Sequence, residues 1–117
     1  MTHGEKKVAK IVEELTMFFF SIGSDHMESG IRREGNQVTI TFEANYQPGY
    51  EYRIHSLEKY MSEPKNDGIE DIYWELAGSG DPGESSQLLL IGMMVDHAEI
   101  ERDDHQIKVT MYKELVN

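Results

Sequence analysis

Hydrophobic residues recur along the first part of the chain with the period of an α-helix. Between Glu5 and Ile22 they fall at every third or fourth position, which places them on one face of a helix. This face is formed by Val8, Ile11, Val12, Leu15, Phe19 and Ile22. Phe18 flanks the face and widens it. Gly23 and Ser24 follow, and because glycine readily takes the left-handed conformation that closes a helix, we predict that the helix ends there.

Two later segments show the period-2 pattern of β-hairpins. The first pairs residues 28–33 with residues 37–46 around a turn at 34–36. Its second strand alternates polar residues with an apolar set, as in a sheet with one buried face. That set is Val38, Ile40, Phe42, Ala44 and Tyr46. The second hairpin pairs residues 98–102 with residues 106–112 around Asp103 and Asp104, and its inward face carries Ile107, Val109 and Met111.

The middle of the chain is predicted to be helical, with one helix over 50–62 and another over 69–76. A loop rich in glycine follows at 78–83 and leads into the densest apolar run, Gly83 to Asp96. Within this run we predict a helix over 86–95. A loop that enters a helix can bind phosphate at the helix N-terminus, or it can simply lead into a core element.

The order helix, Asp-His dipeptide, hairpin occurs twice, through Asp25 and His26 and again through Asp96 and His97. This repetition predicts two helix-plus-hairpin units whose four strands form one mostly antiparallel sheet with the helices on one face. The expected fold class is therefore α+β, a two-layer sandwich. At 117 residues, the chain 1–117 is expected to form a single domain with its own core.

The formal net charge is -11, from 22 acidic and 11 basic residues. Such a surface repels polyanions, which argues against nucleic acid as a partner. It favours solubility, or attraction to a basic protein partner. No apolar run reaches the roughly 18 residues of a membrane span, so no membrane association is expected. The absence of cysteine excludes disulfides and fits a cytoplasmic location, and the N-terminus lacks the form of a signal peptide.

No sequence motif indicates catalysis or a bound metal. The five histidines do not occur in the spacing of a known ligand motif. There is no cysteine nucleophile and no Gly-x-Ser-x-Gly elbow. We therefore predict no catalytic residue, no metal site and no cofactor.

The order of the predicted elements resembles that of the ATP-binding domain shared by histidine kinases and anti-sigma-factor kinases. The segment from Glu14 to Gly23 is similar to the family's first ATP-site helix, Glu-x-x-x-Asn-x-x-x-His-Gly. The strand 38–46 is similar to the family strand that ends in Asp-x-Gly, and the run 83–96 to the Gly-x-Gly-Leu-Gly helix. The resemblance covers about residues 8–115, without the family's usual first strand.

The residues that would bind nucleotide in this family are replaced. Phe18 takes the place of the asparagine that holds Mg²⁺, and a phenylalanine has no oxygen to offer a hard cation. Ala44 replaces the aspartate that reads adenine, and Tyr46 fills the place of a glycine that makes room for the nucleotide. In the glycine-rich loop, Ser85 and Gln87 replace glycines. The resemblance therefore implies a nucleotide-binding fold that no longer binds nucleotide.

Tyrosines gather around the segment that would be the lid of the family's site. They either fill the space of the nucleotide or form a contact surface. The predicted ligand or partner surface comprises Glu14, Phe18, Tyr46, Tyr50, Tyr52, Ser85 and Leu88. We expect a non-catalytic binding or regulatory module that acts through protein contacts, with a homodimer among the candidates. The alternatives are a small-ligand sensor whose pocket is lined by Phe18, Tyr46 and Leu88, and an active ATP-binding anti-sigma-type kinase.

Overall fold

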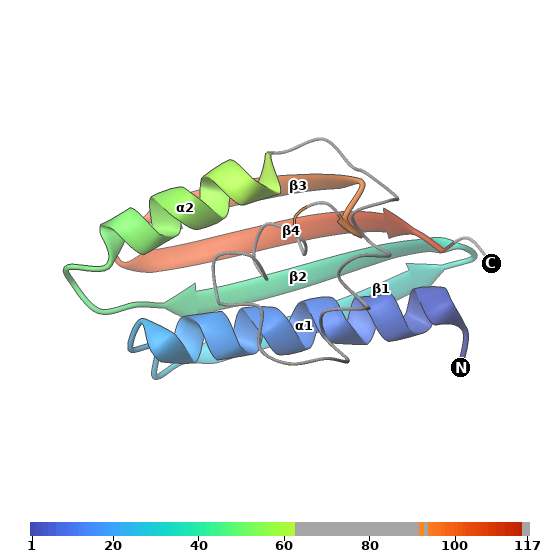
Figure 1. The fold of residues 1–117 in the computed structure, drawn as a ribbon, viewed down its shortest axis with the longest axis horizontal. Coiled ribbons are helices and arrows are strands. Elements are labelled where there is room, and N and C mark those ends of the chain that lie inside the picture. Colours follow the sequence, from blue (N-terminus) through green and yellow to red (C-terminus); the bar gives the residue numbers. More distant parts are fainter. Residues whose placement is uncertain (63–91, 93, 116–117) are drawn as a thin grey trace, which may run out of the picture.

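The computed structural model describes residues 1–62, 92 and 94–115 (Figure 1). Within these residues, two helices and four strands lie close to the predicted positions. Their order is α1 (His3–Ser21), β1 (Met27–Glu34), β2 (Gln37–Asn45), α2 (Glu51–Met61), β3 (His97–Asp103) and β4 (Gln106–Glu114). The predicted helix 69–76, the loop 78–83 and most of the predicted helix 86–95 lie outside the described residues.

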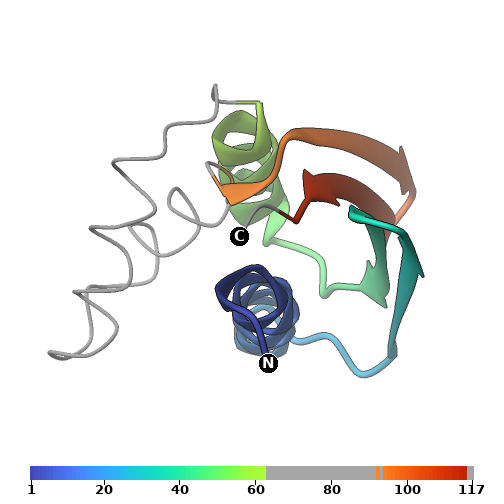
Figure 2. The same cartoon turned by 90° about the vertical axis from the view of Figure 1, so that its right-hand side faces the viewer.

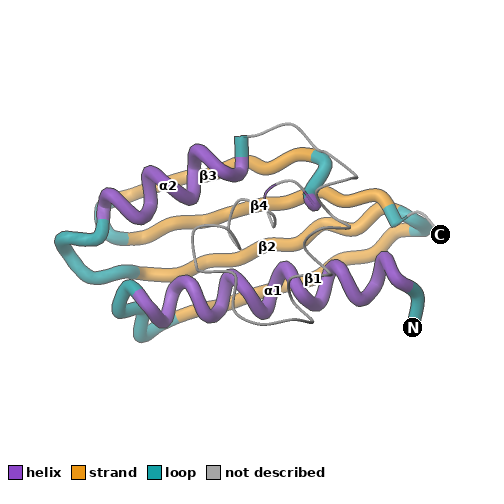
Figure 3. The backbone as a smooth tube through the Cα atoms, in the orientation of Figure 1, coloured by secondary structure: helices purple, strands orange, loops and turns teal. Residues whose placement is uncertain are grey.

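The four strands form one antiparallel sheet in the order β1-β2-β4-β3 (Figure 3). Both helices lie on the same face of the sheet (Figure 2). The predicted α+β fold, with a four-stranded antiparallel sheet and helices on one face, is therefore confirmed. Because β2 and β4 are central, β1 and β3 form the two edges of the sheet.

The two hairpins occupy equivalent places on either side of the sheet centre. Thr41 of β2 pairs with Thr110 at the middle of the β2–β4 ladder. Each hairpin closes through a two-residue turn whose first residue has positive φ, Gly35 at 63° and Asp104 at 57°. Asp103 is the last residue of β3, so the second turn lies one residue later than predicted. Glycine and aspartate both tolerate this backbone conformation in a turn.

The two Asp-His dipeptides are not equivalent, contrary to the repeat that the sequence suggested. When each strand is counted back from its own turn, His97 occupies in β3 the position that Glu28 occupies in β1. His26 lies farther from its turn and is not the equivalent residue. The dipeptides also lie at opposite edges of the sheet, since one precedes β1 and the other leads into β3. They cannot form a joint site.

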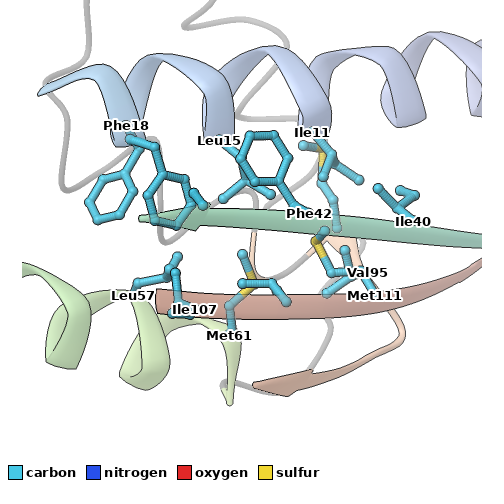
Figure 4. Packing of buried hydrophobic residues seen from close by; sticks show 14 of the residues in the cluster. Ile11, Leu15, Phe18, Ile40, Phe42, Leu57, Met61, Val95, Ile107 and Met111 are labelled. Carbon is cyan, nitrogen blue, oxygen red and sulfur yellow. The ribbon is translucent and has the colours of Figure 1, made fainter. Parts of the chain in front are cut away.

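The core lies between the helices and the sheet (Figure 4). The residues that the periodic patterns placed inward are buried, except that Val12 is only partly buried. Phe19 of α1 stacks on Phe42 of β2 with ring centroids 5.4 Å apart. From α2 the core takes Ile54, Leu57 and Met61. Burial of one face of each element thus fixes how the layers pack.

α1 begins with a capping box that is linked to the first hairpin. The Thr2 hydroxyl accepts from the Glu5 backbone N–H at 3.1 Å, and the Glu5 carboxylate accepts from the Thr2 backbone N–H at 2.7 Å. A second carboxylate oxygen of Glu5 lies 2.7 Å from the Arg33 guanidinium. The hydrogen bonds from Thr2 and from Arg33 lower the pKa of Glu5.

The variant Glu5→Gln is expected to lower the melting temperature at about pH 7 and to have less effect in acid. A carboxyl whose pKa is lower in the folded state contributes stability above its unfolded pKa and loses it as the pH falls through the folded pKa. Thermal unfolding of both proteins between about pH 7 and pH 3 measures this difference. The control is Glu101→Gln, which removes an exposed carboxylate from β3. An equal loss from both variants would contradict a role of the cap.

Candidate functional site

Phe18, which the sequence resemblance aligned with a metal-binding asparagine, belongs to the core. Its ring is buried and meets Phe19 edge to face, with centroids 5.1 Å apart. Figure 4 shows it on the sheet side of α1, in line with Leu15 and Ile11. The Arg53 guanidinium lies 5.3 Å from the centre of the Phe18 ring, within the range of a cation–π contact. Phe18 is therefore a packing residue with a cation against its ring.

Tyr46, which the sequence resemblance aligned with a glycine, is also buried, just beyond the end of β2. Its hydroxyl donates to the backbone carbonyl of Asp104 at 3.3 Å, and its ring meets His105 edge to face. Ala44, which the resemblance aligned with an adenine-reading aspartate, is buried as well. The hydroxyl of Tyr46 is thus already bonded within the fold.

A polar cluster beside Tyr46 joins the β3–β4 hairpin to α2. Arg102 donates to the Glu58 carboxylate at 2.7 Å, and this hydrogen bond raises the pKa of Arg102. His105 Nε2 lies 3.3 Å from Glu51 Oε1. Backbone N–H groups of Glu51 itself and Gly49, and then His105, lower the pKa of Glu51. Each carboxylate here has a partner, so the cluster has a structural role.

Glu14, which the resemblance aligned with the family's glutamate, is buried on α1. Its Oε1 lies 3.4 Å from Nζ of Lys10. Burial acts to lower the pKa of Lys10, but the hydrogen bond with Glu13 and the charge of Glu14 raise it overall. Glu14 is thus held in an ion pair along the helix.

Of the remaining predicted site residues, the structure describes Tyr50 and Tyr52, and these two do not line one open pocket with Phe18 and Tyr46. Tyr50 is partly buried against the core, whereas Tyr52 is exposed, with the two ring centroids 6.4 Å apart. Ser85 and Leu88 lie outside the described residues. Within the described part of the chain, Tyr46 is a core residue and Tyr52 is a surface residue.

A groove between α1 and β1 is the surface that the sequence reasoning missed. It has a volume of about 410 Å³ and is lined by Thr16, Phe20, Asp25, Met27, Ser29 and Phe42. Phe20 is 64% exposed, and Met17 of the same helix is exposed too. The sequence could have indicated this surface, because Met17 to Phe20 are consecutive apolar residues. Four consecutive residues cannot all lie on one face of a helix, so some of these apolar side chains must be exposed.

Two other hollows lie over the strands that the structure describes. One, of about 530 Å³, lies over β1 and β2 and is lined by residues such as Gly30, Arg32 and Thr39. The other, of about 310 Å³, lies near the β3–β4 turn. Among the residues that the structure describes, no group of three or more histidine, aspartate and glutamate side chains is placed to hold a metal ion. None of the helices described is both long and apolar enough to cross a membrane.

Comparison with known proteins gives no relative from which a role could be transferred. No family model matches the chain, no curated protein matches it, and no solved structure matches it.

Proposed function

We propose that this protein is a non-catalytic, cytoplasmic binding or regulatory module that acts through protein contacts. In this proposal the protein has the fold of the ATPase domain of histidine kinases and anti-sigma-factor kinases but has lost nucleotide binding. The observation that carries this proposal is the burial of Phe18, Ala44 and Tyr46, which stand where that family holds Mg²⁺ and the base.

Each of the three residues withholds a group that a nucleotide needs. A hard cation requires oxygen ligands, and Phe18 offers an aromatic ring packed on Phe19. The base amino group requires an acceptor, and Ala44 has none. Tyr46 bonds to the Asp104 carbonyl, so its ring and hydroxyl stay within the fold. A bound nucleotide would have to displace core side chains, which costs packing free energy.

Protein contact is supported by the α1–β1 groove. Exposed aromatic side chains such as Phe20 are frequent anchors at protein interfaces. Asp25 lies in the groove lining, and the whole chain carries a net charge of -11. A partner segment with an apolar anchor and basic flanks fits this surface, since opposite charge both steers and orients association.

A thermal-shift series with ATP, ADP and Mg²⁺ tests the loss of nucleotide binding. We expect no rise in melting temperature, because only a ligand that binds the folded state stabilises it. A rise of several degrees with ATP would contradict the proposal and would favour an active ATPase. A rise with a small metabolite instead would favour the ligand-sensor alternative.

A further inference from the structure

Among the strands that the structure describes, β1 is an edge strand, and one row of its backbone groups has no strand partner there. It pairs with β2 on one side, and all of its residues except Met27 are exposed. The Asn45 N–H donates to the His26 carbonyl at 3.2 Å, so His26 and Asn45 form a hydrogen-bonded pair. This pair shows which residues of β1 form backbone hydrogen bonds with β2. Because antiparallel pairs alternate, Glu28, Gly30 and Arg32 direct their backbone groups to β2. Those of Ser29 and Ile31 therefore point away from the sheet.

The charges of β1 change sign along the strand. Glu28 lies near its start, Arg32 and Arg33 lie near its end, and Glu34 is its last residue. Glu28 lies near His26, at 3.6 Å, but no ion pair of Arg32 is found within the described part of the chain. Because Glu28 and Arg32 lie equally far from Gly30 on either side, this part of the strand is complementary to a copy of itself that runs the opposite way.

We propose that β1 pairs antiparallel with β1 of a second copy of this chain, about a two-fold axis at Gly30. The partner is therefore another molecule of the same protein, and the two sheets join into one. A two-fold axis normal to the sheet keeps the helices of both copies on the same face. This inference goes beyond the proposed function, since it concerns the strand edge and holds with or without a further protein partner.

This register satisfies both the backbone and the charges. Ser29 lies opposite Ile31 of the second copy, and these are the residues whose N–H and C=O groups point outward. Glu28 lies opposite Arg32 of the second copy in a pair without backbone hydrogen bonds, where side chains approach most closely. At the axis itself Gly30 meets Gly30, so no side chain opposes the approach.

Neighbouring registers and the other edge are less favourable. Centring the axis on Ile31 would place Glu28 opposite Glu34, and centring it on Ser29 would place Glu28 opposite Gly30. At the other edge, β3 carries Glu99 and Glu101, and pairing about its middle residue would bring these carboxylates together. Like charges directly opposite each other destabilise a strand pair. The charges therefore select β1.

The helix side of the interface adds apolar contact. Ile31 is 57% exposed and points to the face that carries the helices. In the proposed register the two copies of Ile31 are diagonal neighbours across the axis, within reach of each other. The α1–β1 groove, with Ser29 in its lining, lies beside this contact in each copy.

Sedimentation equilibrium from about 10 µM to about 1 mM tests the dimer, a range that suits a small interface. Wild-type protein is expected to form a reversible dimer. Arg32→Glu and Glu28→Arg should each weaken it about 30-fold or more, because each converts two attractive pairs into two repulsive ones. An equimolar mixture of the two variants should dimerise like the wild type, because the mixed pair restores opposite charges.

Glu99→Arg on β3 is the matched control. Glu99 lies 3.5 Å from His97 as Glu28 lies 3.6 Å from His26, and both carboxylates lie on an edge strand. This variant makes the same change in net charge and should leave dimerisation as in the wild type. Equal weakening by Glu99→Arg and Glu28→Arg would overturn the proposal.

Amide hydrogen exchange gives a test that needs no variant. On concentrating the wild-type protein, exchange at Ser29 and Ile31 should slow, whereas Gly30 and Arg32 should change little because β2 already protects them. A protein that stays monomeric at about 1 mM would overturn the proposal, as would species larger than a dimer, which indicate β1 pairing with β3. Neither outcome affects the nucleotide test of the proposed function.

Discussion

Replacing Phe19 by alanine is expected to destabilise the fold by about 3–5 kcal/mol, the usual cost of removing a buried aromatic side chain. Phe19 is fully buried, stacks on Phe42 and meets Phe18 edge to face. Its ring therefore joins α1 to the sheet. A domain of this size is stable by roughly 5–15 kcal/mol, so the variant would lose a large part of its stability.

The neighbouring residue supplies the control for Phe19→Ala. Phe20→Ala removes the same group from a side chain that is 64% exposed, so its unfolding free energy should stay within about 0.5 kcal/mol of the wild type. Urea unfolding followed by circular dichroism measures both variants. Equal destabilisation by the two changes would contradict the orientation of α1, in which Phe19 is buried against the sheet and Phe20 faces solvent. If the α1–β1 groove binds a partner, Phe20→Ala should weaken that binding while leaving the fold intact.

Gly92→Ala is expected to have the second largest effect, a loss of about 3 kcal/mol. A Cβ at this position would overlap the backbone carbonyl oxygen of Tyr60 and lie 2.7 Å from the carbonyl carbon. Both atoms belong to the backbone near the end of α2, so a side-chain rotation cannot relieve the overlap. The segment at Gly92 or the last turn of α2 must move.

The control for Gly92→Ala is Gly35→Asn in the first hairpin turn. Gly35 has φ of 63° and no atom within 4 Å of an added Cβ, and asparagine tolerates this backbone conformation. Its melting temperature should stay near that of the wild type. Thermal unfolding of both variants distinguishes a close backbone approach from a general cost of replacing glycine. A neutral Gly92→Ala would show that this approach does not constrain the fold.

The strands and helices could be predicted because their apolar periods follow directly from burial. The alternation from Val38 to Tyr46 correctly predicted which side chains of this segment are buried, and the helical period did the same for α1 and α2. The two Asp-His dipeptides suggested equivalent positions in the two hairpins, and this was wrong, because a local match in sequence carries no information about strand register. Pairing puts His97 level with Glu28, since strand register depends on the whole hairpin and its turn.

The candidate site was less predictable than the fold. The family resemblance directed attention to Phe18 and Tyr46, and both are packing residues. The link between Arg102 and Glu58 joins residues far apart in the sequence, so no local pattern could reveal it. The α1–β1 groove exists because α1 packs over β2 and leaves β1 uncovered, which is a property of the assembled layers.

The central ladder of the sheet has a consequence for how the chain folds. β2 and β4 pair along their whole lengths, yet α2 and β3 lie between them in the sequence. Each hairpin closes locally, but the pairing of β2 with β4 also requires a long intervening segment to form a loop. Closing this loop costs conformational entropy, which slows the pairing. During synthesis β2 therefore leaves the ribosome well before its central neighbour, with an apolar face and an unpaired strand edge exposed, and this is the interval in which the chain is most prone to aggregate.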